Sequence, residues 1–167
     1  MALFKNQALI ERARNTKPAA LQKSVEAGLY HFTVKNVGDS TTHQDGKYIE
    51  LTIRAAFDDE ITGELKKAYK LNDRDQDKAA SELRDFLAFV EACGFKSDDA
   101  ENLEHAHFIG RQGLVGVELI EPEYGMPFNV PAFGAWWSED HDPDLIKWHP
   151  REEATRGRRG GGFSKRR

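Results

Sequence analysis

Hydrophobic and polar residues alternate in three runs early in the chain, and one helical pattern and two further strand-like runs follow. Alternation with a period of two predicts a strand with one buried face, and apolar residues three and four positions apart predict an amphipathic helix. The predicted strands are Leu29–Val37, Lys47–Phe57, Glu64–Leu71, Gly113–Ile120 and Phe128–Trp137, and the predicted helix is Lys78–Cys93.

The buried faces can be assigned from the same patterns. We expect the core to contain Tyr30, Phe32 and Val34 of the first strand and Tyr69 of the third, together with Ile49, Leu51, Ile53, Ala55 and Phe57 of the second. The apolar stripe of the helix consists of Ala79, Leu83, Phe86, Leu87 and Val90. Asp75 or Asp77 is a candidate N-cap, and Gly94 is a suitable residue to end the helix.

The order β-β-β-α-β-β is typical of an oligonucleotide/oligosaccharide-binding (OB) barrel. The sequence therefore predicts a mainly β, OB-fold-like five-stranded barrel with one capping helix and flexible basic extensions at both ends. Pro131 restricts the last strand to an edge or a bulge, and Gly116 indicates a bulge or a close approach of another segment. The expected division is an N-terminal extension at 1–27, an OB-fold domain at 28–148 and a disordered Arg/Gly-rich basic tail at 149–167.

Charge is distributed unevenly along the 167 residues, whose net charge is −4. Residues 28–150 carry twelve basic and twenty-four acidic side chains, whereas residues 1–27 carry five basic and two acidic ones and residues 151–167 carry seven basic and two acidic ones. The C-terminal segment is an Arg/Gly-rich arm of the sort that binds nucleic-acid backbones, for which phosphate contacts supply most of the non-specific affinity. For a nucleic-acid-binding protein, two arrangements remain open. Either the lysines of the acidic region 28–150 lie together on one face, or the basic segments 1–27 and 151–167 supply the attraction to phosphates.

Four segments between residues 28 and 121 resemble a family of bacteriophage single-stranded-DNA-binding proteins. These segments are Ala27–Tyr30, Asp45–Leu51, the helix exit from Leu83 to Phe95, and Phe108–Arg111 leading into Val115-Gly116-Val117. The resemblance implies an OB-type core and a role in phage DNA replication or recombination, in the cytoplasm of an infected bacterium. The chain departs from such proteins in its acidic middle and in ending with basic residues, where they often carry an acidic tail.

Candidate nucleic-acid contacts share an outward position on a strand or a place in the basic tail. The outward set is His31, Lys35, Tyr48, Arg54, Lys66 and Lys70, with Arg111 at the edge. Trp136 and Trp137 are adjacent in a strand and point to opposite faces, so one can be buried while the other stacks on bases. The tail adds Arg156, Arg158, Arg159, Lys165, Arg166 and Arg167. Solvated surface charge remains an open alternative for the three lysines, as does packing at the barrel rim for Tyr48.

No pattern in the sequence predicts an enzyme, a cofactor or a metal site. No catalytic elbow, phosphate-binding glycine loop or metalloprotease motif is present, and His105 and His107 lack a third well-spaced ligand. Cys93 is the single cysteine and is expected to be a small buried hydrophobe. No apolar run reaches the roughly 20 residues that a membrane span requires.

The function expected from these features is sequence-tolerant binding of single-stranded DNA by a cytoplasmic protein. Replication or recombination proteins and further copies of the chain are possible partners. Two alternatives remain open at this point: a protein–protein adaptor that uses the Trp136-Trp137 pair, and an RNA-binding chaperone that uses the Arg/Gly arm.

Overall fold

The computed structural model describes residue 8 and residues 24–43, 45–72 and 74–151. Most of the predicted N-terminal extension and nearly all of the basic tail lie outside the described residues. The elements are β1 (Gly28–Asp39), β2 (Lys47–Ala55), β3 (Thr62–Tyr69), α2 (Gln76–Ala92), β4 (Gln112–Ile120) and β5 (Phe128–Ser138), with three 3-10 turns, η2 (Ser97–Asn102), η3 (His105–Phe108) and η4 (Pro143–Leu145).

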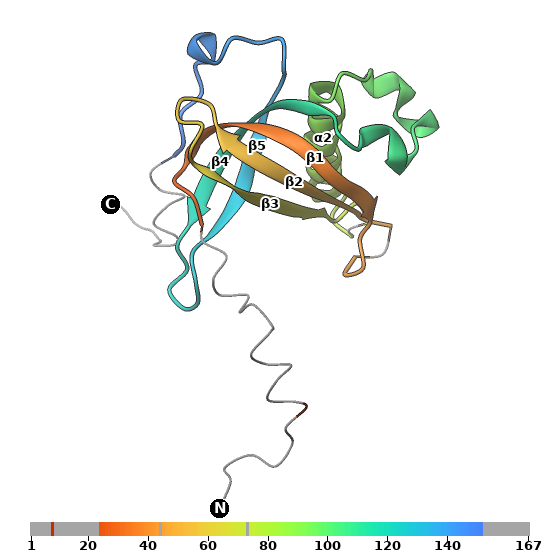
Figure 1. The fold of residues 1–167 in the computed structure, drawn as a ribbon. Helices are drawn as coiled ribbons and strands as arrows, with labels where there is room; N and C mark the ends of the chain where they lie inside the picture. The colour runs from red at the N-terminus through yellow and green to blue at the C-terminus, as the bar shows by residue number, and fades with distance from the viewer. Residues whose placement is uncertain (1–7, 9–23, 44, 73, 152–167) are drawn as a thin grey trace, which may run out of the picture.

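The five strands form one antiparallel sheet in the order β3-β2-β1-β4-β5. The sheet curls into a half-barrel, and α2, which connects β3 to β4, packs mainly against β5 (Figure 1). This arrangement confirms the mainly β, OB-like fold that the order of patterns predicted. No helix in the described ranges is both long and apolar enough to cross a membrane.

The core lies between the concave face of the sheet and α2. Phe89 of α2 is fully buried, and its ring centroid lies 6.0 Å from that of Phe32 and 5.2 Å from that of Trp136. These separations fit the tilted and edge-on aromatic contacts that stabilise cores beyond simple area burial. Asp75 caps α2, because its side chain accepts hydrogen bonds from the backbone N–H groups of Asp77 and Lys78. The helix is therefore fixed at its N-terminus by its cap and along its length by the aromatic cluster.

The seam between the two edge strands, β3 and β5, is bridged by side chains. Asp85 of α2 is 2% exposed and accepts hydrogen bonds from the Tyr69 hydroxyl (2.7 Å), the Gly134 N–H (2.6 Å) and the Trp136 indole N–H (3.1 Å). Tyr69 belongs to β3 and the other two donors belong to β5. One buried carboxylate thus connects both edges of the sheet to the helix.

A residue that precedes β1 is hydrogen-bonded to β5 farther along that strand. The Val25 N–H donates to Asn129 Oδ1 and Asn129 Nδ2 donates to the Val25 carbonyl, both at 2.8 Å. The packed part of the chain therefore begins before Gly28, where the sequence placed the start of the domain.

Residues 139–151 form a strap across the outer face of β4 and β5. A Cβ atom added at Gly116 would lie 2.8 Å from the Trp148 ring, so only glycine leaves room for that ring. Trp148 also packs against Trp137, with 6.4 Å between ring centroids, and Arg151 pairs with the buried Glu118 at 3.3 Å. The close approach expected at Gly116 is confirmed, and packing continues past Trp148.

Two residues differ from their predicted burial. Phe57 was assigned to the core face of the second strand, but it is 68% exposed because β2 ends at Ala55 and the chain turns there. Leu83 was assigned to the apolar stripe of the helix, but it is 43% exposed because α2 turns Asp85, Phe89 and Val90 inward.

Candidate nucleic-acid interface

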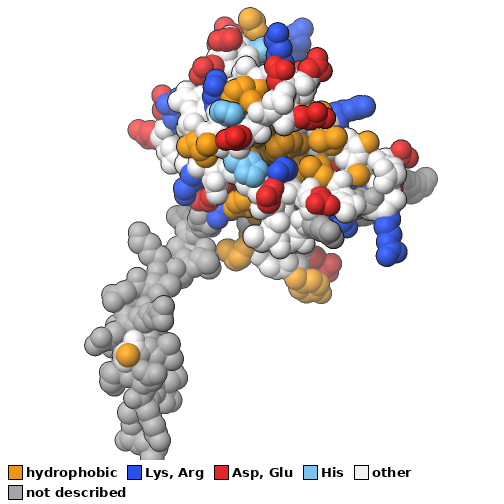
Figure 2. All heavy atoms as spheres, turned by 90° about the vertical axis from the view of Figure 1, so that its right-hand side faces the viewer, with side chains coloured by type: hydrophobic (Ala, Val, Ile, Leu, Met, Phe, Trp, Pro, Cys, Tyr) orange, Lys and Arg blue, Asp and Glu red, His pale blue; other side chains and the backbone are white. Residues whose placement is uncertain are grey.

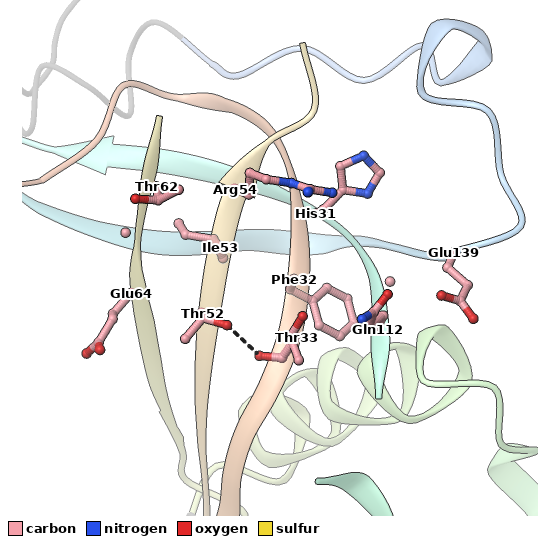
Figure 3. A pocket seen from close by; sticks show the side chains of 12 residues that line it. His31, Phe32, Thr33, Thr52, Ile53, Arg54, Thr62, Glu64, Gln112 and Glu139 are labelled. Atoms are coloured by element: carbon pink, nitrogen blue, oxygen red, sulfur yellow. Dashed lines mark hydrogen bonds between the residues drawn. The ribbon is translucent and has the colours of Figure 1, made fainter. Parts of the chain in front are cut away.

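A groove of about 670 Å³ crosses the outer face of the sheet from β3 to the start of β4 (Figure 3). Its wall is formed by the outward residues of the strands, because alternate side chains of a strand point away from the core. Thr62 and Glu64 lie on one side of the groove, Gln112 and Glu139 lie on the other, and Thr33 and Thr52 lie between them. His31 and Arg54 complete the polar lining.

His31 and Arg54 are register partners on β1 and β2, and their side chains lie together in the groove. Partial burial, with a further contribution from the Arg54 charge, lowers the pKa of His31 below its usual value of 6.5. The imidazole is therefore neutral near pH 7 and can both donate and accept a hydrogen bond. Arg54 Nε lies 3.6 Å from Asp59, an exposed pair that water screens.

The two strand lysines Lys35 and Lys66 lie beside Glu64 at one margin of the groove, and both are paired with carboxylates. Lys35 Nζ is 3.3 Å from Glu64 and 3.8 Å from Glu50, and Lys66 Nζ is 3.6 Å from the same Glu50 oxygen. The hydrogen bond and charge of Glu64, with a smaller contribution from Glu50, raise the pKa of Lys35. The structure places these two lysines on one face of the sheet and gives each one a carboxylate partner.

Arg111 occupies a separate hollow of about 320 Å³ that shares Gln112 and Glu139 with the groove. Its guanidinium lies 4.3 Å from the centre of the Phe95 ring, and its Nε donates to the His107 carbonyl at 3.4 Å. Cys93 also borders this hollow, but the thiol is buried and its pKa is raised to about 12 by burial. Cys93 is therefore a packed apolar residue and not a nucleophile.

The tryptophan pair differs from the sequence-based assignment. Trp136 is 7% exposed and donates its indole N–H to Asp85, so it is a core residue and is removed from the set of ligand contacts. Trp137 points to the outer face, but it is partly buried beside Trp148 of the strap. Neither ring offers an open stacking surface while the strap is in place.

The remaining candidates lie away from the groove. Tyr48 is half-buried on the same face as Thr52 but four residues along β2, and Lys70 follows the end of β3. The tail candidates fall outside the described residues; they are Arg156, Arg158, Arg159, Lys165, Arg166 and Arg167.

Sequence reasoning missed three exposed apolar side chains in and beside the loop from β4 to β5. Tyr124 is 86% exposed, Met126 is 68% exposed, and Phe128, at the start of β5, is 48% exposed. These three residues stand among Glu, Pro and Gly and show no periodic pattern. Only the size of their side chains could have identified them as candidates from the sequence. Single exposed apolar side chains are common, but three along one short stretch make a candidate contact surface.

The surface charge of the body is mixed. Acidic and basic side chains intermingle on the face that carries α2 and the neighbouring 3-10 turns (Figure 2). Within the described ranges, no three His, Cys, Asp or Glu side chains are arranged to hold a metal ion. No protein-family model and no curated protein sequence matches this chain.

Proposed function

We propose that this protein binds single-stranded DNA without strong sequence preference, in the groove across β1, β2, β3 and the start of β4. The observation that carries the proposal is the groove itself: an open polar hollow of about 670 Å³ on the outer face of an OB-like sheet. Neighbouring strands are spaced about 4.8 Å apart, so the groove spans roughly 14 Å between β3 and β4. That span suits a few nucleotides of an extended strand.

The chemistry of the lining supports a single strand as the ligand. Hydroxyl, amide and neutral imidazole groups all donate and accept hydrogen bonds, and these groups come from Thr33, Thr52, Thr62, Gln112 and His31. Such groups can contact the edges of any unpaired base, which fits tolerance of sequence. Arg54 adds a planar cation that can stack on a base or contact a phosphate.

The distribution of charge along the chain supports separate roles for the groove, which contacts bases, and for the basic end segments, which attract phosphates. Arg54 in the groove lining is paired with Asp59, and the neighbouring Lys35 and Lys66 are paired with Glu64 and Glu50, so the groove offers fewer phosphate contacts than base contacts. The basic residues concentrated in 1–27 and 151–167 then supply the long-range attraction to phosphates. A role in phage DNA replication or recombination, in the cytoplasm of the host, belongs to this proposal and rests on the family resemblance.

A fluorescence-anisotropy titration tests the proposal with a labelled dT oligomer and a duplex of equal length. We expect at least about tenfold tighter binding to the single strand, with affinity falling as salt rises. The double variant His31→Ala/Arg54→Ala should lose about tenfold or more of the single-strand affinity. Arg84→Ala, an exposed arginine on α2 outside the groove, is the matched control. Equal affinity for both probes, or a groove variant that binds like the control, contradicts the proposal.

A protein–protein adaptor is the second candidate, and the exposed Tyr124, Met126 and Phe128 favour it. This surface replaces the Trp136-Trp137 pair, whose first member is buried. If the adaptor function holds, alanine at Tyr124 and Met126 abolishes capture of a replication or recombination protein and leaves dT binding unchanged. Matched RNA and DNA oligomers in the same titration separate the RNA-binding alternative, which requires tighter binding to RNA.

A further inference from the structure

Four side chains of alternating charge form a row on the outer face of β1, β2 and β3, in the order Lys66, Glu50, Lys35 and Glu64. Glu50 Oε2 lies 3.6 Å from Lys66 Nζ and 3.8 Å from Lys35 Nζ, and Glu64 Oε2 lies 3.3 Å from Lys35 Nζ. The row has no net charge. Glu64 is also part of the groove lining, so the row is continuous with the proposed binding site.

The backbone places these residues together. Glu50 of β2 is the register partner of Lys66 on β3. The register between β1 and β2 shifts between Val34 and Asn36, where Asn36 is the register partner of Glu50. The intervening Lys35 therefore has no register partner on β2. Alternation along β1 already points Lys35 to the outer face, and the register shift sets it beside Glu50.

Glu50 is the most enclosed member of the row. Its side chain is 17% exposed, whereas the side chains of Lys35 and Lys66 are each 49% exposed. A carboxylate and a phosphate are both anions that accept hydrogen bonds from an ammonium group. Glu50 therefore attracts Lys66, and shares Lys35 with Glu64, through the charge interaction that a DNA phosphate would otherwise make.

We propose, on the basis of the proposed function, that Glu50 is a specificity-determining residue that competes with DNA phosphates for Lys66 and, together with Glu64, for Lys35. While Glu50 is ionised, a ligand that offers only phosphates gains little from this face. A single strand also offers base edges to Thr52, Gln112 and His31, and it binds through them. Glu50 thus directs the groove toward polyanions with unpaired bases and away from duplex.

The variant Glu50→Gln tests this competition, because it keeps the size of the side chain and removes its charge. We expect dT affinity to rise about three- to tenfold at low salt. The slope of log affinity against log salt should steepen by about 0.7, the contribution of one phosphate contact on a single strand, because Lys66 becomes available. Lys35 keeps its 3.3 Å bond to Glu64 in this variant. Duplex affinity should rise at least as much, which narrows the single-strand preference.

Two further variants make the test specific. Glu101→Gln removes the same charge from an exposed position on η2, away from the row, and should leave the slope unchanged. Lys66→Gln combined with Glu50→Gln should cancel the gain in slope, because the released lysine is then missing. Thermal melting of each variant confirms that it is folded.

The outcomes separate this inference from the function on which it rests. If the wild-type protein binds dT and Glu50→Gln binds it with the same affinity and slope, the competition is overturned and the groove function remains. An equal gain from Glu101→Gln also overturns it, because the effect is then one of net charge. If neither wild type nor Glu50→Gln binds single strands, the proposed function fails and the inference fails with it.

Discussion

Asp85 is a buried carboxylate whose three hydrogen-bond donors come from both edge strands of the sheet. A buried charge is tolerated only when its hydrogen bonds are satisfied, and removing one partner leaves the others without compensation. Burial, with a further contribution from Asp85, raises the pKa of the Tyr69 hydroxyl well above its usual value of 10. The hydroxyl therefore stays protonated and remains a donor across the usual pH range.

Replacing Asp85 by alanine should destabilise the fold by about 3–5 kcal/mol, because three buried donors lose their acceptor. Asp85→Asn keeps one carbonyl oxygen for Gly134 and Trp136 and should cost about 1–2 kcal/mol. Urea denaturation monitored by tryptophan fluorescence measures both values. Asp98→Asn, an exposed change on η2, is the control. If Asp85→Ala lowers the free energy of unfolding no more than the control does, Asp85 does not stabilise the contact between β3 and β5.

The protonation of His31 leads us to expect that dT binding depends on pH. Its pKa lies below 6.5, so the imidazole is neutral at pH 7 and gains a positive charge only as the pH falls further. That charge attracts phosphate, so dT affinity should rise as the pH is lowered below 6.5. The lowered pKa also means that the folded protein binds this proton less readily than the unfolded chain, so stability declines below pH 6.5.

The control for this pH effect is His31→Gln, which retains hydrogen bonding but cannot titrate. The difference between wild type and the variant isolates His31 from the five other histidines of the chain. An identical rise in both proteins would place the titrating group elsewhere.

At the scale of elements, the strap at 139–151 is held by the Trp148 ring over Gly116. We expect Gly116→Ala to displace the ring, because the new Cβ would lie 2.8 Å from three of its atoms. The expected results are a red shift of tryptophan emission, faster proteolysis within the strap and a loss of about 1–3 kcal/mol of stability. Gly38→Ala is the control, since a Cβ there meets nothing within 4 Å.

A double-mutant cycle tests whether the Trp148 ring contacts Gly116. In the background of Trp148→Ala, the change Gly116→Ala should cost much less than it does alone, because the clash is gone. Additive costs for the two changes would show that the ring does not lie over Gly116.

The sequence predicted the elements well because each strand has one buried face, which produces a period of two. The pattern could not locate the end of β2, because Phe57 continues the alternation past the turn that begins after Ala55. Alternation also predicted that one of Trp136 and Trp137 is buried without deciding which. That choice depends on the β4–β5 register, which shifts between Val115 and Val117.

The candidate site was less predictable than the fold. His31 and Arg54 were found because outward polar residues on adjacent strands converge when the strands pair. The pairing of Lys35 with Glu50 involves a register shift in β1 that leaves no mark in the sequence. Asp85 interrupts an apolar stripe, and only the three-dimensional structure shows that its partners lie on β3 and β5.

At the scale of the whole molecule, attraction to DNA is expected to depend on the chain termini, because the middle is acidic. Residues 152–167 contain six basic and two acidic side chains and no apolar core pattern. Truncation after Arg151 keeps the Arg151–Glu118 pair and should leave the thermal melt unchanged. The salt slope for dT binding should become shallower by up to about 4. A truncated protein with an unchanged slope would show that the tail makes no phosphate contacts.

The central claim is that a single strand lies in the groove, and amide chemical shifts on addition of a dT oligomer test it most directly. The claim predicts that the largest shifts at saturation fall on outward residues of β1, β2 and β3, among them His31, Thr33, Thr52, Arg54 and Thr62. Residues 121–128, which are outside the groove lining, should shift little. Shifts concentrated in 121–128, or no shift in the groove at saturation, would contradict the claim.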